Sequence, residues 1–351
     1  YEVRGTMLDV ARTPYRYELL QDYAKIMLWY KMNEFHLHVN DNDNANISSS
    51  SFETHSGFHR LESEEFPSLT SETKHAGIPA DLINSDYYNN NEDYQGNPTY
   101  TKDQWRALTQ MCEDMGMYVL TELDMPGHSL LYNKYAAENP DNIEWLAGGT
   151  MLAPSTTSLG QQLELLDLTG PNSQRALRFA STLWDEYTRG EDPVVNADVV
   201  HIGADEYWVH NQATNDAFAK FADTMRQTIQ NNLGEDTKIR MWGASTGSFA
   251  TAQTALGKTA QELAEDYQLD IWSTAYDQAA QRVAEGYQVI NCRDAFLYAN
   301  PGRTNRDVPN AEYLFYDWNP TMFGGNNPLV GEPNLVGAKG VVWGDQSQEG
   351  M

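Results

Sequence analysis

The sequence predicts an α/β fold, a (β/α)8 TIM barrel, on the evidence of its element pattern and its length. Short apolar strands alternate with amphipathic helices or long loops along the whole chain, a pattern typical of a parallel sheet. Eight such strands can be distinguished, and 351 residues is an ordinary length for one barrel. No internal repeat is evident. We therefore expect a single domain over residues 1–351.

The expected strands are short, and the first of them alternates apolar and polar residues. The eight strands are expected at residues 3–10, 34–39, 117–123, 199–202, 238–242, 269–272, 288–291 and 340–343.

The first expected helix follows the first strand, because Leu20, Tyr23, Ala24 and Met27 recur at three- and four-residue spacing. Further helices are expected at residues 102–115, 173–187, 214–231, 261–267 and 278–287. The chain stops at Met351, just after the eighth strand. We therefore expect a fragment of a longer protein, with the barrel truncated before its last helix.

The segment from about residue 40 to residue 100 is polar and rich in Asn, Ser and Asp. A connection of this length without a role is uncommon in compact domains. We therefore expect a functional loop or a small subdomain here.

Composition narrows the class of ligand. The formal net charge of -27 argues against nucleic acid and against anionic lipid, because no basic surface is available to neutralise phosphates. No apolar run approaches the roughly 20 residues that span a bilayer. The two cysteines, Cys112 and Cys292, exclude a disulfide framework but leave one bridge possible. A neutral ligand such as a sugar is compatible with all of these properties.

Functional residues of such a barrel lie where its strands end, at the carboxyl face. Asp205 and Glu206 follow the fourth strand, and two acids held close together cannot both ionise freely. The other polar and aromatic residues on or just after a strand are Arg4, Asp9, Arg12, His36, His38, Asp41, Asn42, Glu122, Asp124, His128, His201, Tyr207, Trp242, Trp272, Tyr298, Asn300, Trp343 and Asp345.

Three of the eight strand ends carry tryptophan, namely Trp242, Trp272 and Trp343. Barrel interiors are dominated by branched aliphatic residues, so core filling alone explains these indoles poorly. Indole faces stack on the C–H faces of pyranose rings, and carboxylates perform glycosidic chemistry. The strand ends therefore indicate a pocket for a neutral sugar.

Five runs of sequence carry a resemblance to a known family. They are VRGTMLDVAR, KMNEFHLHVNDN, ELDMPGHS, HIGADEYW and VVWGDQ. In order and spacing they resemble the catalytic barrel of glycoside hydrolase family 20, the β-N-acetylhexosaminidases and lacto-N-biosidases. The resemblance covers nearly the whole chain and implies a catalytic barrel acting on an oligosaccharide or glycoconjugate, without a cofactor. It also makes a secreted or cell-surface location the expected one.

The resemblance implies a role for each matching residue. Glu206 resembles the general acid and base, and Asp205 resembles the residue that orients the substrate's 2-acetamido group. Tyr298 resembles the partner of the acetamido carbonyl. Trp242, Trp272 and Trp343 resemble the aromatic box, Arg4 and Asp345 resemble residues that bind sugar hydroxyls, and Asp124 and His128 resemble the network behind the acid. His201 is expected to support its strand.

This family is an exception to the usual pair of facing carboxylates, since the acetamido oxygen replaces the enzyme nucleophile and forms an oxazoline. Two positions depart from the pattern of many members: Asn300 stands in place of Asp, and Asp345 in place of Glu. A shorter acid leaves room for a further sugar. The product is therefore open between a terminal N-acetylhexosamine and the disaccharide Galβ1-3GlcNAc.

Other functions compete with this one. His36 and His38 have ligand-like spacing, but a catalytic metal needs further imidazoles and no histidine follows His210, so no metal is expected. Hydrogen bonding to Asp41 or Asp124 is the alternative role of the two histidines.

The NDNDNAN run and Glu349 fit no EF-hand loop. A sugar-binding domain without turnover is expected to lack Asp205 or Glu206, and both are present. Oligomeric state, linkage preference and flanking domains cannot be inferred.

Overall fold

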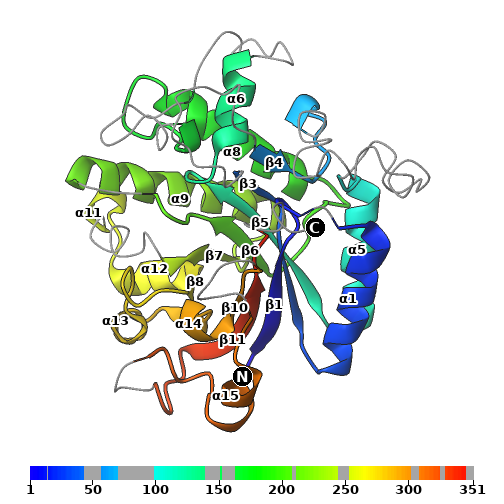
Figure 1. Cartoon of the computed structure of the whole chain (residues 1–351). Coiled ribbons are helices and arrows are strands. Elements are labelled where there is room, and N and C mark those ends of the chain that lie inside the picture. Colours follow the sequence, from blue (N-terminus) through cyan, green and yellow to red (C-terminus); the bar gives the residue numbers. More distant parts are fainter. Residues whose placement is uncertain are drawn as a thin grey trace.

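Eight parallel strands close into a barrel in the computed structural model, which describes residues 1–13, 15–42, 57–69, 99–138, 151, 163–207, 211–243, 253–301, 308–324 and 329–344 (Figure 1). The strands pair in chain order, and the last pairs back onto the first. They are β1 (Val3–Asp9), β2 (Glu34–His38), β5 (Tyr118–Met125), β6 (Val199–Gly203), β7 (Lys238–Trp242), β8 (Tyr267–Ile271), β9 (Gln288–Asn291) and β11 (Leu335–Val342). The predicted TIM barrel is confirmed.

The expected strands all form, with shifted ends. The third extends two residues further than predicted and the eighth begins five residues earlier. A two-residue strand, β10 (Tyr298–Ala299), pairs beside β11.

Helices surround the strands in Figure 1. They are α1 (Tyr17–Trp29), α5 (Lys102–Asp114), α6 (Leu130–Glu138), α8 (Ser173–Thr188), α9 (Gln212–Leu233), α11 (Gln253–Leu256), α12 (Ala260–Asp266), α13 (Ala279–Ala284), α14 (Asp294–Leu297) and α15 (Ala311–Tyr316). Six of them match predicted helices, although α13 is shorter than expected, whereas α6, α11, α14 and α15 were not predicted. Within the described residues, no helix is both long and apolar enough to cross a bilayer.

Part of the long polar segment forms an antiparallel ribbon, in which β3 (Asn40–Asn42) pairs with β4 (Gly57–His59). The ribbon continues directly from β2 and is buried despite its polar sequence. Residues 43–56 and 70–98 lie outside the described part of the chain, so the predicted loop or subdomain remains a prediction there. The disulfide that the sequence left possible is not formed, since Cys112 and Cys292 are both free and buried.

The barrel interior contains paired charges at its amino-terminal half instead of the usual aliphatic layers. Glu34 pairs with Arg240 and, at 3.1 Å, with the Nζ of Lys339, which also pairs with Asp270. Burial alone would raise the pKa of Glu34, but Arg240 and Lys339 lower it to about 2. All four side chains are almost fully buried, so each charge depends on its partners for stabilisation.

We predict that Lys339→Met lowers the free energy of unfolding by about 3–5 kcal/mol, because it leaves buried carboxylates with too little positive charge. Urea denaturation measures this change. Lys25→Met is the matched control, since Lys25 pairs with Asp22 on the surface with both side chains more than half exposed. The control variant should lower the free energy of unfolding by less than about 1 kcal/mol. Equal losses in the two variants would contradict a structural role for the buried pairs.

Candidate active site

A sharp turn at the end of β6 brings Asp205 and Glu206 to the same side of the barrel. The φ angles are 70° at Gly203, 67° at Ala204 and 45° at Glu206, all in the left-handed region. Non-glycine residues adopt such angles rarely, and they are concentrated at functional sites. Gly203 is also sterically required, because a Cβ there would lie 2.2 Å from the Cα of Asp124. The neighbouring strand therefore sets the path of this turn.

Hydrogen bonds then hold Asp205 in place. Its amide N–H donates to Oδ1 of Asp124 at 3.2 Å, and its own Oδ1 accepts from the Glu206 amide at 3.0 Å and the Trp272 indole N–H at 3.1 Å. Asp205 is only 8% exposed, whereas the Glu206 side chain is 36% exposed. Asp205 is thus an inner, fixed carboxyl group and Glu206 an outer, accessible one.

The inner carboxyl groups hold protons unusually well. Burial raises the pKa of Asp205 well above its ordinary value, and the charges of Glu206 and Asp124 act in the same direction. Burial likewise raises the pKa of Asp124 to about 7, although His128 opposes the shift. The two acids after β6 therefore have different environments, as general acid–base chemistry requires.

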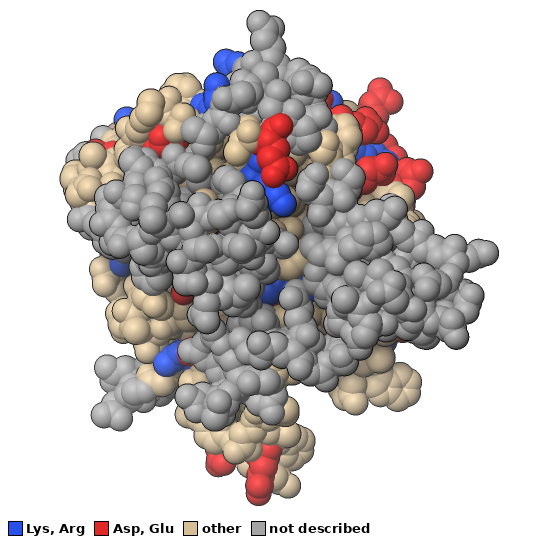
Figure 2. All heavy atoms as spheres, turned by 45° about the horizontal axis from the view of Figure 1, so that its top comes forward, with Lys and Arg blue, Asp and Glu red and all other residues tan. Residues whose placement is uncertain are grey.

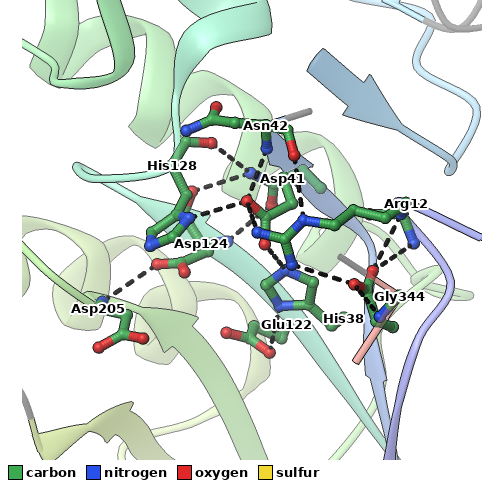
Figure 3. Close-up of polar contacts among 12 residues, drawn as sticks. Arg12, His38, Asp41, Asn42, Glu122, Asp124, His128, Asp205 and Gly344 are labelled. Carbon is green, nitrogen blue, oxygen red and sulfur yellow. Dashed lines mark hydrogen bonds and ion pairs between the residues drawn. The ribbon is translucent and has the colours of Figure 1, made fainter. Parts of the chain in front are cut away.

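A chain of polar contacts leads from Glu206 into the protein, and Figure 3 shows its links between His128, Asp41, His38 and Arg12. His128 places Nε2 3.7 Å from Glu206 Oε2 and Nδ1 2.8 Å from Asp41 Oδ1. Asp41 also contacts His38 at 2.6 Å and Arg12 at 2.7 Å. Burial alone would lower the pKa of His128, but Asp41 and Asp124 raise it well above its ordinary value. The surroundings of the imidazole beside Glu206 therefore favour its protonated form.

Glu122 organises the floor of the site. It accepts the indole N–H of Trp242 at 2.5 Å and lies 2.8 Å from Nε2 of His36 and 2.8 Å from Nδ1 of His38. The expected contact of His38 with Asp41 is present, whereas His36 contacts Glu122 instead. His201 supports the β6 turn by accepting the Gly203 N–H at 3.0 Å.

Two groups of side chains on this floor have metal-like spacing: His36, Glu122 and His201, and His38, Glu122 and Asp124. The histidine nitrogens in these groups lie close to other charged groups of the protein. The Nδ1 of His36 faces the Nζ of Lys339 at 2.8 Å, and the Nε2 of His201 faces Asp270 at 3.2 Å. A buried ammonium 2.8 Å from His36 opposes a second cation, so this environment fits ion pairing better than metal binding.

The predicted aromatic residues form one continuous wall. Trp272 stacks on Tyr298 with ring centroids 6.3 Å apart, Tyr298 meets the edge of Trp343 at 6.0 Å, and Trp343 lies 5.9 Å from Trp242. Trp242, Trp272 and Tyr298 are all less than 9% exposed. Asn300, two residues beyond Tyr298, is buried. The wall adjoins Asp205 through the Trp272 indole.

One predicted site residue is wrong. Arg4 lies at the amino-terminal end of β1, exposed, with its guanidinium bound to the backbone carbonyls of Lys31 and Tyr1. That is the end of the barrel opposite the acids. The arginine that reaches the site is Arg12, just beyond β1, whose Cζ lies 5.5 Å from the Trp343 ring centroid. Asp345 lies outside the described residues.

Two further carboxylates belong to the site. Asp9 accepts hydrogen bonds from Arg12 and from the Gly344 amide at 3.0 Å, which joins the ends of β1 and β11. Its position at a strand end was noted from the sequence, but no role was predicted. Glu164 contacts Asn42 at 2.9 Å. It follows no strand, so the strand-end rule could not find it.

Comparisons with known proteins agree with this arrangement. The description "Glycosyl hydrolase family 20, catalytic domain" matches residues 1–350, so the chain belongs to this family.

Curated relatives resemble the chain over much of its length. A lacto-N-biosidase of Bifidobacterium bifidum is 24% identical over 268 residues, which are 71% of this chain and 21% of the relative. A beta-hexosaminidase of Vibrio furnissii is 23% identical over 307 residues, which are 85% of this chain and 44% of the relative. The chain thus spans less than half the length of either relative.

Solved structures share the fold. Dispersin B superimposes with a TM-score of 0.66 at 19% identity, over 99% of this chain and 93% of that one. The β-N-acetylhexosaminidase from Streptomyces coelicolor A3(2) gives 0.63 at 19% identity, over 98% of this chain and 60% of that one.

The indole N–H of Trp272 reports on Asp205, and we predict that its NMR resonance titrates above the ordinary range of an aspartate. In Asp124→Asn the midpoint should move to lower pH, because a neighbouring negative charge that disfavours ionisation of Asp205 is removed. The chain has nine tryptophans, and Trp272→Phe assigns the resonance. Trp29, which is 83% exposed, is the internal control. An unmoved midpoint would contradict the coupling.

Proposed function

We propose that this chain hydrolyses β-linked 2-acetamido sugars with retention of configuration, using the substrate's acetamido group as nucleophile. The observation that carries the proposal is the geometry of Asp205. Its Oδ1 accepts from the Glu206 amide and from the indole N–H of Trp272 in the aromatic wall, while Oδ2 has no hydrogen-bond partner among the described residues. A fixed carboxyl oxygen beside stacked rings suits the N–H of an acetamide lying against them, and a hydrogen bond from that N–H favours the ionised form of Asp205.

The first step divides the work between Glu206 and the substrate. Glu206 donates its proton to the glycosidic oxygen while the bond from that oxygen to C1 breaks. The acetamido carbonyl oxygen attacks C1 from the opposite face and forms an oxazoline. Because the attack is intramolecular, it needs no second enzyme carboxylate at C1 and gains a high effective molarity. Adjacent acids in the sequence therefore suffice.

The second step reverses the proton transfer. Glu206, now a carboxylate, accepts a proton from water as the water oxygen attacks C1 and opens the oxazoline. Two inversions at C1 give net retention.

Asp205 orients the acetamide and stabilises the positive charge that develops on its nitrogen. Tyr298 is proposed to donate its hydroxyl to the acetamido oxygen, and Arg12 replaces Arg4 as the candidate ligand for sugar hydroxyls.

A second candidate product is the disaccharide Galβ1-3GlcNAc, which would make the enzyme a lacto-N-biosidase. Two observations favour it: the similarity to the Bifidobacterium bifidum lacto-N-biosidase, and the presence of Asn300 and Asp345 where many members carry Asp and Glu. The monosaccharide product is favoured by the similarity to beta-hexosaminidases. The catalytic step is the same for both products. The two alternatives differ only in the space that the pocket leaves beyond the outer hydroxyl groups of the cleaved sugar.

We predict that Glu206→Gln lowers kcat on an oligosaccharide substrate by about 10²–10⁴-fold, because glutamine cannot donate the proton. Steady-state kinetics measures the loss. Glu332→Gln, an exposed glutamate at the other end of the barrel, is the control and should retain full activity. Near-normal turnover by Glu206→Gln would refute the assignment.

The product is decided by two chromogenic substrates. We expect 4-nitrophenol release from either the β-GlcNAc glycoside or the β-lacto-N-bioside, with a preference of about 100-fold or more for one of them. A pocket closed around one sugar excludes the disaccharide, whereas in a pocket for two sugars the monosaccharide loses the contacts of the second sugar. Release only from the monosaccharide derivative would end the lacto-N-biosidase proposal. Release only from the disaccharide derivative would end the exo-hexosaminidase one.

A further inference from the structure

Glu164 is held beside the acid by contacts on two sides of its segment. Its backbone carbonyl accepts the Ser129 N–H at 2.8 Å, next to His128. Two residues on, Leu166 accepts from the hydroxyl of Tyr207 at 3.3 Å, next to Glu206. The segment around Glu164 therefore lies between the loop after β5 and the turn after β6. Its position is set by the same loops that set the catalytic acid.

The Glu164 carboxylate has one occupied oxygen and one available oxygen. Oε2 accepts the side-chain N–H of Asn42 at 2.9 Å, while Oε1 has no hydrogen-bond partner within the described ranges. The residue is only partly buried. Burial raises the pKa of Glu164, His128 lowers it and Glu206 raises it, so the charges of His128 and Glu206 both act on this carboxyl group. Glu164 thus offers a hydrogen-bond acceptor close to the acid.

Glu164 lies on the outer side of the site. In Figure 3 Glu122, Asp41 and Asn42 follow one another away from the barrel floor, and Glu164 binds the outermost of them. Glu122, Asp41 and Asn42 are all buried, whereas Glu164 is half-buried and the Glu206 side chain is 36% exposed. Under the proposed function, the sugar that is cleaved lies against the inner aromatic wall. The leaving group then passes outward beyond Glu206, whose charge also acts on Glu164.

We propose that Glu164 forms part of a subsite for the leaving sugar and accepts a hydrogen bond from one of its hydroxyl groups. The proposal rests on the proposed function, because it takes Glu206 as the group that protonates the leaving oxygen. A carboxylate ligand favours neutral, hydroxyl-rich sugars and disfavours anionic ones. The charge of the protein agrees with this preference, and Figure 2 shows Asp and Glu side chains grouped at the edges of this face.

A purely structural role is the competing explanation, since Asn42 also accepts the Leu130 N–H at 2.9 Å and adjoins Asp41. The two explanations differ in which substrates are affected. Loss of a structural contact should slow every substrate alike. Loss of a ligand to the leaving sugar should slow only those substrates that carry such a sugar.

Glu164→Gln separates these explanations, because glutamine keeps the size of the side chain and can still accept from Asn42. Each variant is assayed at its own pH optimum on a pair of substrates with the same cleaved sugar. The leaving group is a neutral hexose in one and 4-nitrophenol in the other. We expect kcat/KM to fall about 10-fold or more on the first, the usual value of a hydrogen bond to a charged group, and less than about threefold on the second. Glu332→Gln is the control variant and should leave kcat/KM unchanged on both substrates.

A gain of activity provides a readout that damage to the fold cannot imitate. With a hexuronic acid as leaving sugar, Glu164→Gln should raise kcat/KM relative to the neutral hexose by about threefold or more, because a like charge is removed. Equal losses on the neutral-hexose and 4-nitrophenyl substrates, or an unchanged uronic-to-neutral ratio, would overturn the subsite. Absence of turnover by the unaltered protein on every 2-acetamido glycoside would instead refute the proposed function.

Discussion

The close packing of two loops, those that follow β5 and β6, is the constraint on which the site depends. A Cβ at Gly127 would lie 2.4 Å from the Asp205 carbonyl oxygen, and one at Gly203 would lie 2.2 Å from the Cα of Asp124. Backbones this close leave the chain after β6 no extended path, so Ala204 and Glu206 take left-handed angles. In an extended strand, the neighbouring side chains of Asp205 and Glu206 would point in opposite directions. The turn instead makes Asp205 an inner carboxyl group and Glu206 an outer one. Their division of roles is therefore a consequence of backbone geometry.

The floor beneath these loops is held by a connected network of paired charges. Lys339 links Glu34 and Asp270 and faces His36, which contacts Glu122, and Glu122 in turn holds the Trp242 indole. Such a network contributes little net stability compared with an apolar core, but breaking one member is costly. The network fixes one orientation for each of these rings and imidazoles. Aliphatic packing would allow them several orientations. The arrangement thus favours a preorganised site over maximal stability.

The barrel could be predicted because each strand is apolar and each helix periodic, and these are local properties of the sequence. The strand-end rule also placed Asp205, Glu206, Trp242, Trp272, Trp343 and Tyr298 together correctly. The assignment that failed came from the family resemblance. Arg4 was assigned by its position in a motif, although it lies at the wrong end of β1, and Arg12 enters the site only because the chain bends after Asp9. The buried ribbon of Asn40–Asn42 and the position of Glu164 depend on tertiary contacts, which no local pattern of polar residues reveals.

The central claim, that the substrate supplies the nucleophile which Asp205 positions, is tested most directly by weakening that nucleophile alone. Aryl glycosides bearing acetamido, fluoroacetamido, difluoroacetamido and trifluoroacetamido groups differ little in size but progressively in the basicity of the carbonyl oxygen. If this oxygen attacks C1, kcat/KM should fall steeply with each added fluorine, by about 10-fold or more across the series. A rate independent of fluorination would contradict the account, because the attacking group would then belong to the protein or to water.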